Sequence, residues 1–316
     1  MKILVSGCAG FIGFHLCKKL ISNGHEVIGI DNLDDYYDVS LKLARLDLLN
    51  SNNSFCFKES DINTSIAYEK KIDIYINLAA QAGVRLDSSK KFKYTHSNIS
   101  GFEGVLKTCE LNGITKIIYA SSSSVYSGNA KSPFSEKDFL NEPTSYYAST
   151  KIENEKKAQK YVSNNNSKMI GLRFFTVYGP WGRPDMAYYL FSKNILENRP
   201  INLYNNGNTY RDMTFIEDIV DGIMQSINRI NVSNIKHEIF NLGNTKPIKT
   251  LDLISKIENH LQKKAVLNNV FSANEVIKTH ADISKSQEVL SYSPKIDLDN
   301  GLTTFMQWFK NYYNVS

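Results

Sequence analysis

The chain has 316 residues, of which 42% are hydrophobic and 22% are charged. This length and composition exclude a disordered chain and predict a soluble protein with one large core and a smaller lobe. The formal net charge is +5, from 37 basic and 32 acidic residues. Because no dense block of lysine and arginine marks a nucleic-acid footprint, we expect no nucleic-acid partner.

Targeting and metal-binding patterns give no signal. No apolar run reaches the roughly eighteen residues of a membrane span, and the start MKILVSG does not resemble a secretory leader. We therefore expect a cytoplasmic protein with no membrane partner. Cys8, Cys17, Cys56 and Cys109 form no C-x-x-C pair, and the six histidines show no ligand spacing. Neither a disulfide nor a metal is predicted.

The first thirty residues predict strand, glycine turn, helix and strand. Lys2–Ser6 is a short apolar run, Gly7, Gly10 and Gly13 follow at a spacing of three, and an apolar helical repeat ends at Asn23-Gly24. Bare glycines let a backbone approach a pyrophosphate, whose charge is stabilised at a helix N-terminus. Glycines also serve in plain turns, but the flanking strands favour a dinucleotide site.

Asp31 ends the second expected strand. Its carboxylate is placed to accept hydrogen bonds from both hydroxyls of an adenosine ribose and to repel a 2'-phosphate, which predicts NAD over NADP. The GxxGxxG spacing resembles that of the extended short-chain dehydrogenase/reductase family.

The chain up to Phe174 alternates strands and helices, which predicts an α/β fold with a Rossmann-type doubly wound parallel sheet. A helix after Asp31 is expected to carry Leu43, Leu46 and Leu49 at a spacing of three, and a further helix is expected at about Thr95–Asn112. The remaining strands are expected at Phe55–Lys58, Ile72–Leu78, Lys116–Ser121 and Met169–Phe174. Such strand ends face the ligand crevice of a parallel sheet. Small residues at Ala79 and Ala80 would let a dinucleotide lie against the backbone, although tight packing would also explain them.

The alternation breaks from Phe175 onward. We expect the NAD-binding domain to comprise residues 1–174 plus about 213–243. A smaller C-terminal α/β substrate lobe is expected from about 175–212 plus 244–316, with a strand at Ile201–Tyr204.

Four serines, Ser121 to Ser124, stand at the carboxyl end of the strand expected at Lys116–Ser121, and Tyr147 and Lys151 follow one connection later. A spacing of four places Tyr147 and Lys151 on one helical face. A solvated turn is the alternative for the serines. The same Y-x-x-x-K spacing recurs at Tyr189 and Lys193, which lie beyond the last strand of the alternating region and are interpreted as structural.

These residues suit oxidation of an alcohol. A phenol has a pKa of about 10, and an ammonium one turn away together with a positive nicotinamide should lower it. Tyr147 would take the proton of a sugar hydroxyl while the carbon gives its hydride to NAD. Ser122 would hydrogen-bond the same oxygen, and Lys151 would hold the nicotinamide ribose.

Several stretches resemble the UDP-glucuronate 4-epimerases among the extended short-chain dehydrogenases: GCAGFIGFHL, DNLDDYYDVSLKLARL, LAAQAGVR, ASSSSVY, YYASTK, RFFTVYGPWGRPDMA and YRDMTFIEDIVDGI. The resemblance implies NAD-dependent conversion of UDP-glucuronate to UDP-galacturonate, through C4 oxidation, rotation of the 4-keto sugar and re-reduction. It also implies a homodimer formed by the helices that hold Asn98 and Lys151.

The resemblance completes the set of expected contacts. It places Phe175 at the nicotinamide, Arg211 at the diphosphate, and Ser123, Ser124, Thr176 and Arg183 around the sugar carboxylate. For each arginine, a role in a surface salt bridge is the alternative. The expected cofactor contacts are Gly7, Gly10, Phe11, Ile12, Gly13, Asp31, Asn32, Asp61, Ile62, Leu78, Ala79, Ala80, Asn98, Tyr147, Lys151 and Phe175. The expected substrate contacts are Arg85, Ser122, Ser123, Ser124, Tyr147, Thr176, Arg183 and Arg211.

Related reactions are disfavoured by what is missing. Sugar-nucleotide 4,6-dehydratases carry Asp-Glu, and glucuronate decarboxylases a glutamate, in places occupied here by Ser123 and Ser124. Ser127, Leu86-Asp87 and Ala273–Glu275 depart from the epimerase pattern. A 4-epimerase of UDP-glucose, UDP-N-acetylglucosamine or its uronic acid remains an alternative. A non-catalytic NAD-sensing regulator would have no need of Ser122, Tyr147 and Lys151 together.

Overall fold

The computed structural model describes residues 1–83, 91–128, 131–270 and 276–315. Its strands are β1 Lys2–Ser6, β2 Glu26–Asp31, β3 Phe55–Glu59, β4 Ile74–Asn77, β5 Lys116–Ser122, β6 Lys168–Phe174, β7 Thr176–Tyr178, β8 Ile201–Tyr204, β9 Tyr210–Phe215, β10 His237–Leu242, β11 Pro247–Lys249 and β12 Leu267–Val270. Its α-helices are α1 Phe11–Ser22, α2 Val39–Asn50, α3 Lys91–Tyr94, α4 Gly101–Leu111, α5 Tyr146–Asn164, α6 Ala187–Leu196, α7 Ile216–Val232, α8 Thr250–Leu261, α9 Ser284–Leu290 and α10 Leu298–Tyr312. A π-helix spans Thr95–Ser100, and 3₁₀ turns span Ser123–Tyr126 and Asn205–Gly207.

Seven strands form one parallel sheet in the order β10-β6-β5-β4-β1-β2-β3. This is the Rossmann order with β10 added at one edge, so the expected fold class is confirmed. The strand order reverses direction between β1 and β4. At such a switch point the carboxyl ends of neighbouring strands diverge and leave a crevice for a ligand.

Consecutive side chains of a strand point to opposite faces of the sheet, and helices bury both faces. In β1, Ile3 and Val5 pack with α1 and α7, whereas Leu4 packs in a second cluster with α4 and α5. The same alternation holds in β5, where Ile118 faces the first cluster and Ile117 the second. Helical layers therefore cover both faces of the sheet and hold its strand ends at the crevice.

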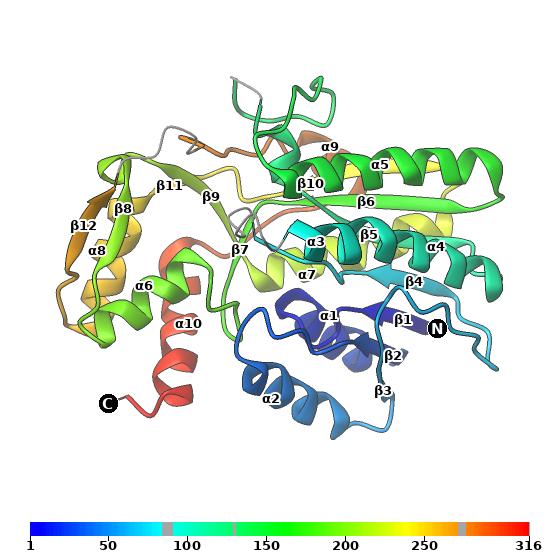
Figure 1. The fold of residues 1–316 in the computed structure, drawn as a ribbon, viewed down its shortest axis with the longest axis horizontal. Helices are drawn as coiled ribbons and strands as arrows, with labels where there is room; N and C mark the ends of the chain where they lie inside the picture. The colour runs from blue at the N-terminus through cyan, green and yellow to red at the C-terminus, as the bar shows by residue number, and fades with distance from the viewer. Residues whose placement is uncertain (84–90, 129–130, 271–275, 316) are drawn as a thin grey trace.

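The second half of the chain adds two small sheets beside the large one. One has the order β11-β9-β7 and the other pairs β12 with β8. Figure 1 shows β8, β12, α6, α8 and α10 gathered at the side of the molecule away from β1–β3. Strand β10 lies in the large sheet, although it follows β9 in sequence.

Helix α2 buries only part of the leucine repeat. Leu46 and Leu49 are buried, but the side chain of Leu43 is 47% exposed. A period of three drifts from the 3.6-residue helical turn, and the buried face instead takes Leu41 and Arg45. Arg45 donates to the carbonyls of Ala9, Trp181 and Gly182 at 2.8, 2.6 and 3.1 Å. It therefore ties the glycine turn to the segment just before Arg183.

Two further features concern the described residues as a whole. None of their helices is long and apolar enough to cross a membrane. All four cysteines are free thiols, three of them buried.

Candidate active site

One continuous cavity of about 1080 Å³ lies at the carboxyl ends of the central strands and extends to α6, β8 and β9. It brings together nearly all the described residues that the sequence analysis singled out. Those lining it are Gly7, Gly10, Phe11, Ile12, Gly13, Asp31, Asn32, Asp61, Ile62, Leu78, Ala79, Ala80, Ser122, Ser123, Ser124, Tyr147, Lys151, Phe175, Thr176, Arg183 and Arg211.

The glycine turn fits a pyrophosphate. A Cβ on Gly13 would come within 2.0 Å of the Gly7 carbonyl oxygen. Gly7 has φ +79°, and a Cβ on this residue would lie only 2.8 Å from Ala79 N. Side chains are therefore excluded where backbone must approach a ligand. Helix α1 begins after Gly10 without a side-chain cap, so its first N–H groups and dipole face the cavity as an anion site.

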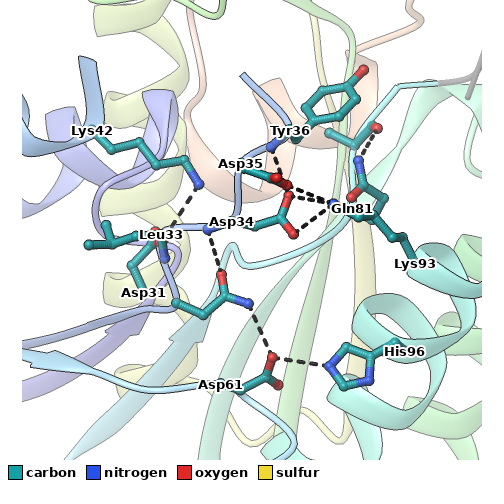
Figure 2. Close-up of polar contacts among 12 residues, drawn as sticks. Asp31, Leu33, Asp34, Asp35, Tyr36, Lys42, Asp61, Gln81, Lys93 and His96 are labelled. Carbon is teal, nitrogen blue, oxygen red and sulfur yellow. Dashed lines mark hydrogen bonds and ion pairs between the residues drawn. The ribbon is translucent and has the colours of Figure 1, made fainter. Parts of the chain in front are cut away.

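Two carboxylates, Asp31 and Asp61, line the cavity near the ends of β2 and β3 (Figure 2). Asp31 accepts hydrogen bonds from Ala9 N at 3.1 Å and Leu33 N at 2.9 Å, and Lys42 Nζ lies 3.7 Å from its Oδ1. Asp61 accepts from Asn32 Nδ2 at 3.1 Å, and its Oδ2 lies 3.1 Å from His96 Nε2. Burial opposes ionisation of Asp61, but these contacts and those from Asn63 outweigh it and lower its pKa to about 2.

Tyr147 and Lys151 project from the first turns of α5. Ser145 starts this helix by accepting the Ala148 N–H at 3.2 Å. The ammonium of Lys151 donates to Ala120 O at 3.0 Å and lies 5.8 Å from the centre of the Tyr147 ring. Burial lowers the pKa of Lys151 to about 8, against an opposing effect of Glu155.

The expected fall in the pKa of Tyr147 depends on a bound nicotinamide, and the side chains of the protein alone do not produce it. Burial raises that pKa above its usual value, while the charge of Arg183 and the Ser122 hydroxyl act in the opposite direction. Lys151 is directed to a backbone carbonyl of β5, so it contributes less to the phenol than the Y-x-x-x-K pattern suggests.

The serines at the carboxyl end of β5 have two different sets of contacts. Ser122 accepts Ser124 N at 3.1 Å and donates to Ser124 Oγ at 3.2 Å, at the cavity wall. Ser121 donates instead to buried Glu155 at 2.6 Å, and Arg173 binds the same carboxylate at 2.9 and 2.7 Å. The buried ion pair of Glu155 and Arg173 therefore holds the end of β5 through Ser121.

Two arginines, Arg183 and Arg211, also line the cavity. Arg183 binds Asp185 through Nε at 3.0 Å and NH2 at 2.6 Å. Arg211 NH1 donates to the carbonyls of Tyr210 and Val276 at 3.0 and 2.7 Å. Both guanidinium groups are thus held in place at the wall where an anionic ligand would bind.

Asn98 does not line the cavity. Its amide accepts Gln81 N at 2.8 Å and donates to Gln81 O at 3.1 Å and Thr150 Oγ1 at 3.0 Å. It therefore holds the segment after β4, and a direct contact of Asn98 with the cofactor stays a prediction. Arg85 lies outside the described residues, as do Leu86-Asp87 and Ala273–Glu275.

The second Y-x-x-x-K instance is structural, as expected. Tyr189 is buried and its hydroxyl lies 2.7 Å from that of Tyr313, while Lys193 lies over the Tyr313 ring. Neither side chain lines the cavity.

Sequence reasoning missed Tyr36, Lys42 and Asp185, which also line the cavity. A buried lysine on the apolar face of α2 was a usable signal for Lys42. An acid two residues after Arg183 was a weak signal for Asp185. The Tyr36 hydroxyl donates to Asp185 Oδ2 at 3.1 Å across 149 residues of sequence, and nothing local predicts that contact.

Comparisons with known proteins agree with this geometry. A model of the NAD dependent epimerase/dehydratase family matches residues 3–243. UDP-glucuronate 4-epimerase 3 of Arabidopsis thaliana is 42% identical over an alignment that covers 99% of this chain and 77% of the plant protein. Protein CapI of Staphylococcus aureus is 39% identical, with 99% of each chain covered. The crystal structure of UDP-glucuronic acid 4-epimerase from Bacillus cereus, in complex with UDP-glucuronic acid and NAD, is 36% identical with a TM-score of 0.90, and the match covers 99% of this chain and 100% of that one.

Proposed function

This chain belongs to the NAD dependent epimerase/dehydratase family, and on that premise we propose that it is an NAD-dependent UDP-glucuronate 4-epimerase. It interconverts UDP-glucuronate and UDP-galacturonate by oxidising C4 and reducing it again from the opposite face. The observation that carries this proposal is the shared cavity, in which Ser122, Tyr147 and Lys151 lie between the glycine turn and Arg183. Full-length relatives of that activity support it.

The glycine turn and Asp31 hold the cofactor. The N–H groups at the start of α1 bind its pyrophosphate, and the Asp31 carboxylate binds the adenosine ribose hydroxyls. Lys151 holds the nicotinamide ribose, and Phe175 packs at the nicotinamide. The chemistry that NAD supplies when bound is the reversible acceptance of a hydride from C4.

Proton transfer falls to Tyr147. Its hydroxyl takes the proton of the C4 hydroxyl during oxidation and returns one during reduction, while Ser122 hydrogen-bonds the same oxygen and stabilises its charge. Burial raises the pKa of Tyr147, while the charge of Arg183 and the Ser122 hydroxyl oppose that rise and so favour the phenolate.

The substrate is held from its two ends. Arg211 binds the UDP diphosphate, and Ser123, Ser124, Thr176 and Arg183 bind the sugar carboxylate. The 4-keto intermediate is a β-keto acid that would lose carbon dioxide if the carboxylate bond aligned with the ketone. We infer that these hydroxyls keep that bond out of alignment.

Proton NMR of the purified protein with UDP-glucuronate, UDP-glucose and UDP-N-acetylglucosamine, each supplied separately, tests this function. Appearance of the anomeric signal of UDP-galacturonate, from UDP-glucuronate alone, is the expected result. Conversion of a neutral sugar with none of the uronate would contradict it.

We further propose the setting in which the enzyme works. The lobes are residues 1–174 plus about 213–243 for NAD and about 175–212 plus 244–316 for the UDP-sugar; the presence of β10 in the large sheet supports this division. Two copies associate through the helices that hold Asn98 and Lys151, which are the Thr95–Ser100 π-helix with α4, and α5. Free thiols support a cytoplasmic location, where the product would supply polysaccharide biosynthesis.

A further inference from the structure

Arg183 already has a carboxylate partner within the chain. Asp185 accepts from its Nε at 3.0 Å and its NH2 at 2.6 Å, and all these groups line the cavity. The Asp185 and Arg183 side chains are 29% and 23% exposed, so the pair is only partly screened by water. Bidentate binding of this kind occupies one edge of the guanidinium.

Tyr36 holds Asp185 in that position from the other side. Its hydroxyl donates to Asp185 Oδ2 at 3.1 Å. Tyr36 belongs to the segment between β2 and α2, where Lys93 of α3 binds Asp34 and Asp35 at 3.1 and 2.9 Å. Figure 2 shows the Tyr36 ring directed away from these ion pairs. The acid that faces Arg183 is therefore fixed by the cofactor domain and is not a loose surface partner.

This arrangement has two consequences for an incoming carboxylate. The edge formed by Nε and NH2 is taken, so a sugar carboxylate meets the guanidinium at its remaining donors. The positive charge of Arg183 is also largely cancelled by Asp185, which weakens the attraction for a second anion. An arginine without such a partner would bind the carboxylate more tightly.

Tight binding is a disadvantage in this reaction. The hydride returns to the opposite face of C4, so the sugar has to rotate between oxidation and reduction. The carboxylate on C5 moves with the ring and must leave Arg183 during each turnover. A group that binds the carboxylate strongly both before and after rotation stabilises these two states but not the state between them. Such a group therefore slows the rotation.

We propose that Asp185 weakens the hold of Arg183 on the substrate carboxylate and so permits rotation of the 4-keto sugar. Asp185 is thus a positioning residue that weakens substrate binding and speeds turnover, and Tyr36 keeps it in place. This inference rests on the proposed UDP-glucuronate 4-epimerase function.

The test is the variant Asp185→Asn, purified with its cofactor, with Asp185→Ser as a second neutral replacement. We expect the KM for UDP-glucuronate to fall at least threefold and kcat to fall at least threefold. The inhibition constant of UDP-glucose, which has no carboxylate, should stay within twofold of the wild-type value. Asp35→Asn removes a negative charge from the same region without touching Arg183, and should leave both KM and kcat unchanged.

A KM that rises or stays constant in both neutral variants would overturn the inference, because Asp185 would then merely orient Arg183. Calorimetric dissociation constants for UDP-glucuronate and UDP-glucose supply a readout that needs no turnover. If the wild-type protein produces no UDP-galacturonate, the proposed function fails. If it does, but neither Asp185 variant binds UDP-glucuronate more tightly, only the present inference fails.

Discussion

At the scale of single residues, Tyr147 is the side chain on which the proposed chemistry depends. Replacement of Tyr147 by phenylalanine removes the proton acceptor but keeps the ring. We expect kcat to fall by about 10²–10⁴, with cofactor content and thermal midpoint unchanged. Initial rates by NMR measure the loss.

The neighbouring tyrosine provides a matched control for that variant. Tyr146 is 40% exposed and its hydroxyl lies 2.8 Å from Thr95 Oγ1. Tyr146→Phe should keep wild-type kcat. Equal losses in the two variants would mean that Tyr147 is not the proton acceptor.

Lys151 sets the upper limit of the pH range. Its buried ammonium has a pKa of about 8, so the charged form is present below that pH and is lost as the pH rises through it. Because the ammonium holds the ribose and favours the phenolate, kcat should decline above about pH 8. A kcat profile that stays flat well into the alkaline range would show that the charge of Lys151 is dispensable.

Single residues also show where sequence reasoning ends. Gly7, Asp31 and Tyr147 could be found because motif and spacing place them at strand and helix ends. The hydrogen-bond partners of the Asn98 amide, Gln81 and Thr150, could not be predicted, since they are set by tertiary packing. The rise that burial causes in the pKa of Tyr147 could not be predicted either, because burial cannot be read from spacing.

At the scale of elements, the turn between β1 and α1 is the most constrained. Gly13→Ala would place a Cβ 2.0 Å from the Gly7 carbonyl oxygen, so the turn must open. We expect a loss of at least about 2 kcal/mol in the free energy of unfolding and purified protein that retains little NAD. Denaturant titration and the ultraviolet spectrum of the extracted cofactor measure the two effects.

Gly24 separates backbone strain from cofactor binding. It has φ +77° but no atom within 4 Å of a Cβ position. Gly24→Ala should cost about 1 kcal/mol and leave the NAD content intact. If Gly13→Ala also kept its NAD, the turn would not be the pyrophosphate site.

The periodic elements could be predicted closely, and the exceptions have a geometric cause. Strands β1 and β8 lie where the sequence places them, and β4 is shorter than expected, at Ile74–Asn77. In α2 the leucines counted at a spacing of three mislead, because the buried face follows the 3.6-residue turn and takes Arg45. A buried guanidinium gives no apolar signal.

At the scale of the whole molecule, the proposed dimer is testable without a variant. Sedimentation should give about twice the 35.9 kDa of one chain. On dilution, amide exchange should accelerate in α4 and α5 but not in α10, since only the former lie in the proposed interface. A mass of one chain at all concentrations would exclude this association.

The arrangement of the cavity is only partly predictable at this scale. Alternating strands and helices indicate the doubly wound sheet and hence which strand ends meet. The contact between Tyr36 and Asp185 joins segments 149 residues apart, and Arg45 joins α2 to the carbonyls of Trp181 and Gly182. Neither contact has a local sequence pattern, so the way these segments meet around the cavity could not be predicted from the sequence.

The most direct test of the central claim follows an isotope through one reaction. UDP-glucuronate carrying deuterium at C4 is incubated with the purified protein in ordinary water, and the product is analysed by NMR. If C4 is oxidised and reduced again within one site, UDP-galacturonate retains deuterium at C4. Formation of UDP-galacturonate with protium at C4, or no UDP-galacturonate at all, would contradict the account.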